Sequence, residues 1–213
     1  MKAGIVGLPN VGKSTLFNCL SNTKAQSANF PFCTIEPNHS IINVPDKRLI
    51  TLQEIVNPEK LIPATVEIVD IAGLVKGASK GEGLGNKFLA NIRETDAIIH
   101  VLRCFDNDNI THVDGSVDPI RDKEIIDIEL QLKDLESLNN RLEKVSRTVK
   151  SGDKEAAREK EVLNQAISFI ESSNNIRSID LDEDDINKYL KPLQLITSKP
   201  VLYVCNVDEG SVT

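Results

Sequence analysis

Residues 7–14 read Gly7-Leu8-Pro9-Asn10-Val11-Gly12-Lys13-Ser14. They match the pattern GxxxxGK[ST], in which glycines allow backbone N–H groups to surround phosphate oxygens. A short apolar run over residues 2–6 precedes this loop, and apolar residues with helical spacing follow it over residues 13–20. Because the motif requires a strand before it and a helix after it, the segment predicts a P-loop nucleotide-binding site.

Beyond this loop, β-rich runs alternate with helical patterns. The sequence predicts strands over residues 40–44, 65–69, 97–102 and 201–205, and helices over residues 47–56 and 84–94. This alternation is typical of α/β proteins. We therefore predict the Ras-like fold of P-loop NTPases, a mostly parallel sheet flanked by helices.

The stretch from residue 121 to residue 199 contains no predicted strand. Apolar residues recur at steps of three or four over 128–149 and again over 156–170, and Ser151-Gly152-Asp153 separates the two patterns. This predicts an inserted α-helical hairpin or short coiled coil. The acidic run 182–185 is interpreted as the start of a short helix that runs to Leu190, although it could also meet a basic partner.

These patterns divide the chain into three parts. We expect a nucleotide-binding domain over residues 1–120, the inserted helical domain over 121–199, and a return strand over 200–213 that rejoins the sheet and carries a base-recognition motif. The boundary follows from the position of the helical block, which lies between two strand-forming regions.

Composition excludes several classes of protein. The 213 residues are 40% hydrophobic and 27% charged, which is ordinary for a globular chain. Lys and Arg number 25 against 32 Asp and Glu, and the resulting net charge of −7 argues against generic DNA or RNA binding. The four cysteines have no CxxC spacing, and no run approaches the roughly 20 apolar residues of a membrane span. We expect no membrane partner and a cytoplasmic location.

One further motif is expected to meet the P-loop residues that bind phosphate and metal. Lys13 should reach the β- and γ-phosphates, and Ser14 should bind Mg²⁺. Asp70-Ile71-Ala72-Gly73 follows the predicted strand 65–69, so Asp70 can face the metal and the Gly73 N–H can face the γ-phosphate. These positions predict phosphoryl transfer to water by positioning and charge neutralisation.

Two loops are candidates for movement that depends on the nucleotide. The proline-rich stretch 29–37 contains Thr34, which we predict as a further metal ligand in the triphosphate state, with Thr23 as its rival. The glycine-rich segment 76–85 has the composition of a second loop that senses the γ-phosphate.

The last predicted strand ends in Asn206-Val207-Asp208-Glu209. The order of the motifs resembles that of translation-factor-type P-loop NTPases, whose base-reading motif is usually Asn-Lys-x-Asp. Here Val207 and Glu209 replace the lysine and the aspartate. A carboxylate displaced by one methylene should lose its paired hydrogen bonds to guanine, and an unpaired donor costs roughly 1–3 kcal/mol. The departure argues against guanine specificity.

Four stretches, the last of which carries this departure, closely resemble the YchF family of Obg-like ATPases. They are residues 7–14, 29–38 (NFPFCTIEPN), 70–79 (DIAGLVKGAS) and 206–209. The resemblance covers essentially the whole chain, including the helical insertion. It implies a slow Mg²⁺-dependent switch that hydrolyses ATP in preference to GTP and associates with ribosomes. It also implies a C-terminal TGS domain beyond these residues, so we expect the chain to be the N-terminal part of a longer protein.

The resemblance also implies site residues. Nucleotide contacts are expected from Asn10, Val11, Gly12, Lys13, Ser14 and Thr15, and from Asn206, Val207 and Glu209. Many related GTPases have a water-orienting glutamine where this chain has Leu74, so another group must place the water. Asn10 resembles the asparagine that coordinates potassium in some relatives, which makes K⁺ stimulation a hypothesis; alternatively, Asn10 only stabilises the loop.

Three alternative functions stay open from the sequence. The chain could be a GTPase of the Obg-like class. It could instead be a nucleotide-gated module for ribosome or RNA binding, in which hydrolysis is only a reset. A small-molecule kinase is a weaker alternative, because the motifs suit a switch and no acceptor site is visible.

Overall fold

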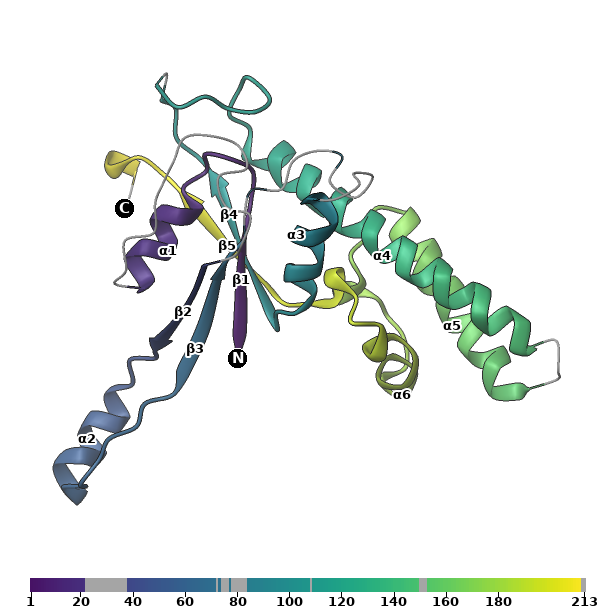
Figure 1. The fold of residues 1–213 in the computed structure, drawn as a ribbon, viewed down its shortest axis with the longest axis horizontal. Coiled ribbons are helices and arrows are strands. Elements are labelled where there is room, and N and C mark those ends of the chain that lie inside the picture. Colours follow the sequence, from purple (N-terminus) through teal and green to yellow (C-terminus); the bar gives the residue numbers. More distant parts are fainter. Residues whose placement is uncertain are drawn as a thin grey trace.

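The computed structural model describes residues 1–21, 38–71, 73, 77, 84–107, 109–149 and 153–211. Within these ranges five strands form one sheet, and the helices flank it or extend from it (Figure 1). The strands are β1 (Lys2–Val6), β2 (Asn38–Asn43), β3 (Thr65–Asp70), β4 (Ala97–Arg103) and β5 (Val201–Asn206). The helices are α1 (Lys13–Ser21), α2 (Lys47–Val56), α3 (Leu84–Arg93), α4 (Pro119–Val149), α5 (Lys154–Glu171) and α6 (Glu183–Asp185). Each predicted strand and helix is present, and the ends lie within two residues of those expected except at the start of α4, which begins nine residues before the apolar pattern at 128–149.

The sheet places β1 at its centre. The strands lie in the order β2-β3-β1-β4-β5, and β2 runs antiparallel to β3 while the other neighbouring strands are parallel. Ala3, Ile5 and Val6 of β1 are buried, as expected for a central strand covered on both faces. Strand β3 lies on one side of β1 and β4 lies on the other. The carboxyl end of β1 is therefore a topological switch point, where open α/β sheets bind ligands.

Helix α2 extends from the sheet instead of covering it. It connects β2 to β3 and lies at the far end of both strands, at the lower left of Figure 1. Asp46 caps its first turn by accepting a hydrogen bond from the Arg48 N–H, and Asn57 ends it in a left-handed conformation. None of its residues is buried. The helix predicted for 47–56 therefore forms, but most of its apolar side chains stay exposed.

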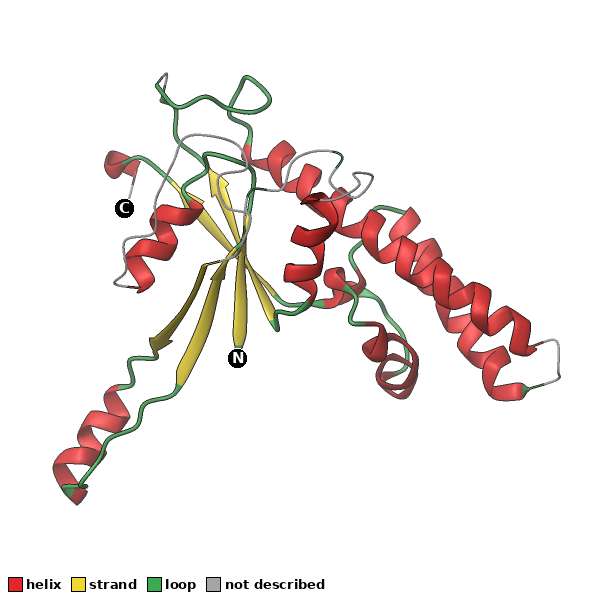
Figure 2. Cartoon of the chain, in the orientation of Figure 1, coloured by secondary structure: helices red, strands yellow, loops and turns green. Residues whose placement is uncertain are grey.

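Helices α4 and α5 form the expected hairpin, which projects from the sheet (Figure 2). Asp153, in the predicted break, caps α5 by accepting hydrogen bonds from the Glu155 and Ala156 N–H groups. Over residues 121–149 and 153–199 there is no strand. No helix in the described ranges is long and apolar enough to cross a membrane.

Helix α4 contributes to two hydrophobic clusters. Its first half places Ile126 and Leu130 in the cluster that fills the sheet layer. Its second half places Leu138 and Val145 in a separate cluster with apolar residues of α5 and the segment that follows it. One continuous helix thus connects the sheet core to the core of the hairpin.

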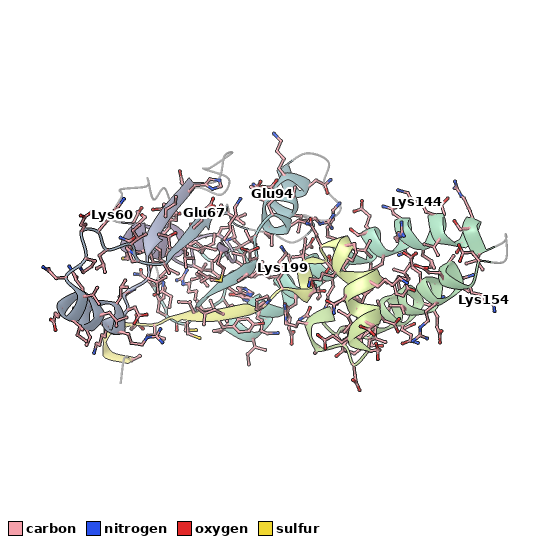
Figure 3. All side chains as sticks on the ribbon, turned by 90° about the horizontal axis from the view of Figure 1, so that it is seen from below. Lys60, Glu67, Glu94, Lys144, Lys154 and Lys199 are labelled. Carbon is pink, nitrogen blue, oxygen red and sulfur yellow. The ribbon has the colours of Figure 1, made fainter. Side chains whose placement is uncertain are left out.

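The chain returns to the sheet through a hydrogen-bonded joint. Asp134 of α4 is fully buried and accepts hydrogen bonds from the Ile196 N–H at 2.8 Å and the Thr197 N–H at 2.7 Å. The Thr197 hydroxyl also donates to Asp134, at 2.7 Å. Lys199, labelled in Figure 3 where the chain leaves the helical region, donates to the Arg93 carbonyl at 2.7 Å. These contacts fix the start of β5 against α3 and α4.

The acidic run 182–185 opens a short helix, as predicted. Asp182 caps α6 by accepting a hydrogen bond from the Asp184 N–H. A π-helical turn then continues from Ile186 to Leu190. Asp185 pairs with Arg158 of α5, so this acid contributes to the contact between the segment and the hairpin.

Candidate nucleotide-binding site

The P-loop connects β1 to α1 and turns sharply at two positions. Asn10 has φ 61° and Gly12 has φ 102°, both in the left-handed region. The φ of Gly12 favours glycine, and a Cβ there would also lie 2.5 Å from Asn206 Nδ2. The Leu16 N–H donates to the Gly12 carbonyl at 2.9 Å, so α1 begins directly at the loop. The N–H groups in the first turn of a helix lack partners within the helix, and they form the arrangement that binds anions.

Lys13 is buried within this loop. Its side chain donates to the Leu8 carbonyl at 2.7 Å, and the residue is 7% exposed. Loss of water lowers the pKa of Lys13 from 10.5 to about 8, although the negative charge of Asp70 acts in the opposite direction. A phosphate bound beside Lys13 would stabilise its charged form and so raise this pKa again.

Ser14 and Asp70 meet beside the loop. The Ser14 hydroxyl donates to Asp70 Oδ2 at 2.8 Å. Asp70 ends β3, pairs with Ile5 of β1 and is 4% exposed. Burial raises the pKa of Asp70, while the hydrogen bond from Ser14 and the charge of Lys13 lower it. Hydroxyl and carboxylate oxygens are the donors that Mg²⁺ prefers, so this pair fits a magnesium ion.

Gly73 brings the Asp-x-x-Gly motif against the P-loop. A Cβ at this position would lie 3.0 Å from the Pro9 nitrogen and 3.2 Å from Lys13 Nζ. The backbone of Gly73 therefore approaches the lysine more closely than a larger residue would allow. Residues 13, 14, 70 and 73, predicted separately from two motifs, come together at the carboxyl ends of β1 and β3.

The end of β5 contacts the other side of the P-loop. Asn206 Nδ2 donates to the Val11 carbonyl at 3.0 Å. Val207 is half-buried, and Glu209 is exposed at the start of the short turn Glu209–Ser211. The structure thus brings Asn206 to the loop, while the carboxylate of Glu209 lies at the surface.

The segment between β4 and α4 also reaches the P-loop, a contact that the sequence analysis missed. Asn10 Nδ2 donates to the Thr111 carbonyl at 3.1 Å. Arg103, which is buried at the end of β4, holds the same segment. Its guanidinium donates to the carbonyl groups of Phe105, Asn107 and Ile110 at 3.1, 3.2 and 3.0 Å. No sequence signal marks Thr111, because any residue offers a backbone carbonyl.

A buried pair anchors this segment to α4. His112 Nε2 lies 2.8 Å from Asp122 Oδ2, and both side chains are buried. His112 Nδ1 accepts a hydrogen bond from the Asp114 N–H at 3.1 Å. Both ring nitrogens of His112 are therefore in use, which fixes the orientation of the ring beside Thr111.

The remaining predicted site residues have varied positions. Val11 is buried, and Thr15 is exposed on α1. Thr34, its rival Thr23, and Leu74 lie outside the described residues. Their expected roles therefore stay predictions.

Comparison with known proteins places this site in a family. The family model described as 50S ribosome-binding GTPase matches residues 2–141. The chain belongs to this family. Within this GTPase family its sequence is similar to proteins named Ribosome-binding ATPase YchF, which confirms the expected resemblance. It is 55% identical to the protein of Haemophilus ducreyi over 210 residues and 56% identical to that of Bacillus subtilis over 212 residues.

These relatives are longer than the chain. The chain spans 58% of the length of both proteins, while the matches cover 99% and 100% of its own residues. A solved structure, that of the Schizosaccharomyces pombe YchF GTPase, matches with a TM-score of 0.79 and 40% identity, and covers 99% of this chain and 57% of that chain. The GTPase-family fold described above is therefore shared along the chain. The Haemophilus ducreyi and Bacillus subtilis proteins are named ATPases, and the Schizosaccharomyces pombe protein is named a GTPase.

Proposed function

We propose that the chain is the nucleotide-hydrolysing part of a Mg²⁺-dependent ATPase that prefers ATP to GTP and acts as a slow conformational switch on the ribosome. P-loop nucleotide hydrolysis is the activity of its family. The observation that carries the proposal is the convergence of Lys13, Ser14, Asp70 and Gly73 at the carboxyl ends of β1 and β3. Those four residues supply groups for phosphate and metal binding that transfer of a γ-phosphate to water requires.

Each residue has a proposed task. Lys13 neutralises the β- and γ-phosphate oxygens, and the Gly73 N–H donates to the γ-phosphate. Ser14 and Asp70 would hold Mg²⁺, with Thr34 as a further ligand, and the ion supplies charge neutralisation at the phosphates when it is bound. Leu74 has no polar atom in its side chain to orient water. Turnover should therefore be slow until a substrate phosphate or a partner places the water.

The preference for ATP rests on the end of β5. We propose that Asn206 contacts the base and that Val207 and Glu209 reduce the affinity for guanine. The exposed position of Glu209 and its extra methylene support this proposal, because a guanine-reading carboxylate must meet two donors at fixed geometry. Sequence similarity to proteins named ATPases gives further support.

The preference is tested by calorimetric titration of ATP and GTP, each with Mg²⁺. The double change Val207→Lys with Glu209→Asp restores the usual guanine motif and should raise the affinity for GTP relative to ATP about tenfold or more. Asp208→Asn, which changes the intervening exposed residue, is the matched control. Tighter binding of GTP than ATP by the unchanged chain would return the protein to the GTPase alternative.

A titration of a longer chain locates the selectivity. The same measurement on a chain as long as the curated relatives shows whether the residues present here are sufficient. Equal selectivity in both chains would assign it to residues present here, and selectivity only in the longer chain would assign it to residues that follow.

The second candidate function is a nucleotide-gated ribosome-binding module. The variant Lys13→Ala distinguishes it from the ATPase switch. This variant should lose phosphate release. Ribosome binding that persists in the full-length variant would show that hydrolysis only resets the bound state. Association with the ribosome, proposed from the names of the relatives, would place the protein in the cytoplasm.

We also propose the domain division at residues 1–120, 121–199 and 200–213. The two separate hydrophobic clusters support it, although α4 contributes to both. Potassium stimulation is the less supported hypothesis, because Asn10 Nδ2 is bonded to the Thr111 carbonyl, as expected of a residue that stabilises the loop. Equal hydrolysis rates in KCl and NaCl would reject it.

A further inference from the structure

One hydrogen bond joins α4 to the segment that follows Gly73. The Gly77 N–H donates to Glu129 Oε1 at 2.6 Å. Gly77 has φ 88°, a left-handed conformation that favours glycine. Gly73, a few residues earlier, lies against Pro9 and Lys13 of the P-loop. Glu129 therefore contacts, from the helical region, the segment that carries the backbone donor proposed for the γ-phosphate.

The surroundings of Glu129 hold its carboxylate in place. The residue is only 4% exposed, which is costly for a carboxylate unless it accepts hydrogen bonds. Ile126, one turn earlier on α4, and Leu130, the next residue, are both buried in the cluster of the sheet. The helix is therefore packed against the sheet at this point, and a rigid element aims Glu129 at Gly77.

Glu129 is one of four buried acids on α4, and three of them hydrogen-bond groups outside the helix. A hydrogen bond from a backbone N–H to a carboxylate is stronger than one between neutral groups, so each anchor restrains its partner. These three partners are His112 for Asp122, Gly77 for Glu129 and the Ile196–Thr197 backbone for Asp134. The fourth acid, Asp127, pairs with Lys123 of α4 itself and lies 3.6 Å from Arg177. Among the contacts between described residues, that of Glu129 reaches the stretch that follows Gly73.

We infer that Glu129 is a positioning residue for the γ-phosphate site. By holding the Gly77 N–H, it fixes the chain four residues after Gly73, whose N–H is proposed to donate to the third phosphate, so the inference rests on the proposed function. A nucleoside triphosphate needs this restraint, whereas a diphosphate has no group at that position. Glu129 should therefore affect triphosphate binding and turnover but not diphosphate binding.

The test compares Glu129→Ala and Glu129→Gln with Glu124→Ala, which removes an exposed carboxylate from the same helix. Each protein is titrated with ADP and with a non-hydrolysable ATP analogue, both with Mg²⁺, and its turnover is measured with ATP. Glu129→Ala should lower the analogue affinity and kcat about tenfold or more, with the ADP affinity changed less than about twofold. Glu129→Gln keeps an acceptor oxygen and should recover most of the loss, and Glu124→Ala should match the unchanged chain.

A second readout reports on the hydrogen bond itself. Labelling with ¹³C-lysine and ¹⁵N-glycine selects the amides of Gly77 and Gly81, the two glycines that follow a lysine in the sequence. An N–H that donates to a carboxylate resonates downfield. One of the two peaks should therefore move upfield in Glu129→Ala and stay in place in Glu124→Ala.

The outcomes separate this inference from its alternatives. Equal losses of ADP and analogue affinity in Glu129→Ala would make the residue merely structural and overturn the inference. Unmoved glycine peaks, or an unchanged analogue affinity, would overturn it as well. If the unchanged chain binds both nucleotides but does not hydrolyse ATP, the proposed activity fails, while the affinity and amide readouts still decide the role of Glu129.

Discussion

Nucleotide affinity should fall steeply as pH rises, because Lys13 must be charged to hold phosphate. Burial lowers the pKa of Lys13 to about 8 in the free protein, whereas the phosphates should restore it to its ordinary 10.5 or higher. The free protein then loses the proton above pH 8 and the complex keeps it, so binding takes up a proton. Between pH 7 and pH 9.5 linkage predicts that the Kd for ATP rises about thirtyfold.

Calorimetric titration checks this prediction in two ways. The Kd is measured from pH 7 to 9.5, and at pH 8.5 the binding enthalpies in buffers of different ionisation enthalpy should report uptake of about 0.8 proton. Lys13→Met removes the titrating group. The variant should bind ATP more weakly, and its Kd should vary little with pH, because every other titrating group is the same in both proteins. A wild-type affinity that stays constant between pH 7 and 9.5 would refute the reasoning.

Three further predictions concern single residues. Gly12→Ala should destabilise the fold by about 1–3 kcal/mol and weaken nucleotide binding, because φ is 102° and the new methyl group would lie 2.5 Å from Asn206 Nδ2; thermal unfolding and titration measure this. Asp134→Ala leaves three buried donors without their acceptor. It should lower the free energy of unfolding by about 3 kcal/mol, or Tm by roughly 6–12 °C. The control Glu136→Ala, on the exposed face of α4, should lower the free energy of unfolding by at most about 0.5 kcal/mol. Ser14→Ala should reduce the increase in nucleotide affinity that Mg²⁺ provides by about tenfold or more and leave metal-free binding unchanged; an unchanged dependence on Mg²⁺ in titrations would exclude Ser14 as a ligand.

The elements of the fold could be predicted because their signals are local. Strands and helices follow from the period of apolar residues over short windows, and the P-loop is a contiguous stretch of eight residues. The start of α4 shows what a closer reading of local signals adds. Asp118 accepts a hydrogen bond from the Arg121 N–H at 3.1 Å, and Pro119 begins the helix, a typical cap that places the start of α4 before the first apolar repeat.

The contacts that assemble the site could not be predicted, because they join residues far apart in the sequence through backbone groups. The Asn10 side chain meets the carbonyl of Thr111, and Glu129 meets the N–H of Gly77. Every residue except proline offers both groups, so no pattern marks the partner. In helix α2 a local signal is misleading. Its apolar residues suggest burial, yet none is buried in the structure.

The position of β5 in the chain determines when the nucleotide site is complete during synthesis. The ribosome makes β1 through β4 first, then the whole α4–α5 hairpin, and only afterwards Val201 to Asn206. The hairpin is built from contacts between neighbours in sequence, which form quickly, whereas β5 must close a long loop to pair with β4. A nascent chain released before β5 emerges would carry its phosphate loop without the side chain of Asn206 that bonds to Val11. Nucleotide binding should therefore begin only after the α4–α5 hairpin has folded, so a bound nucleotide would indicate that the hairpin is complete.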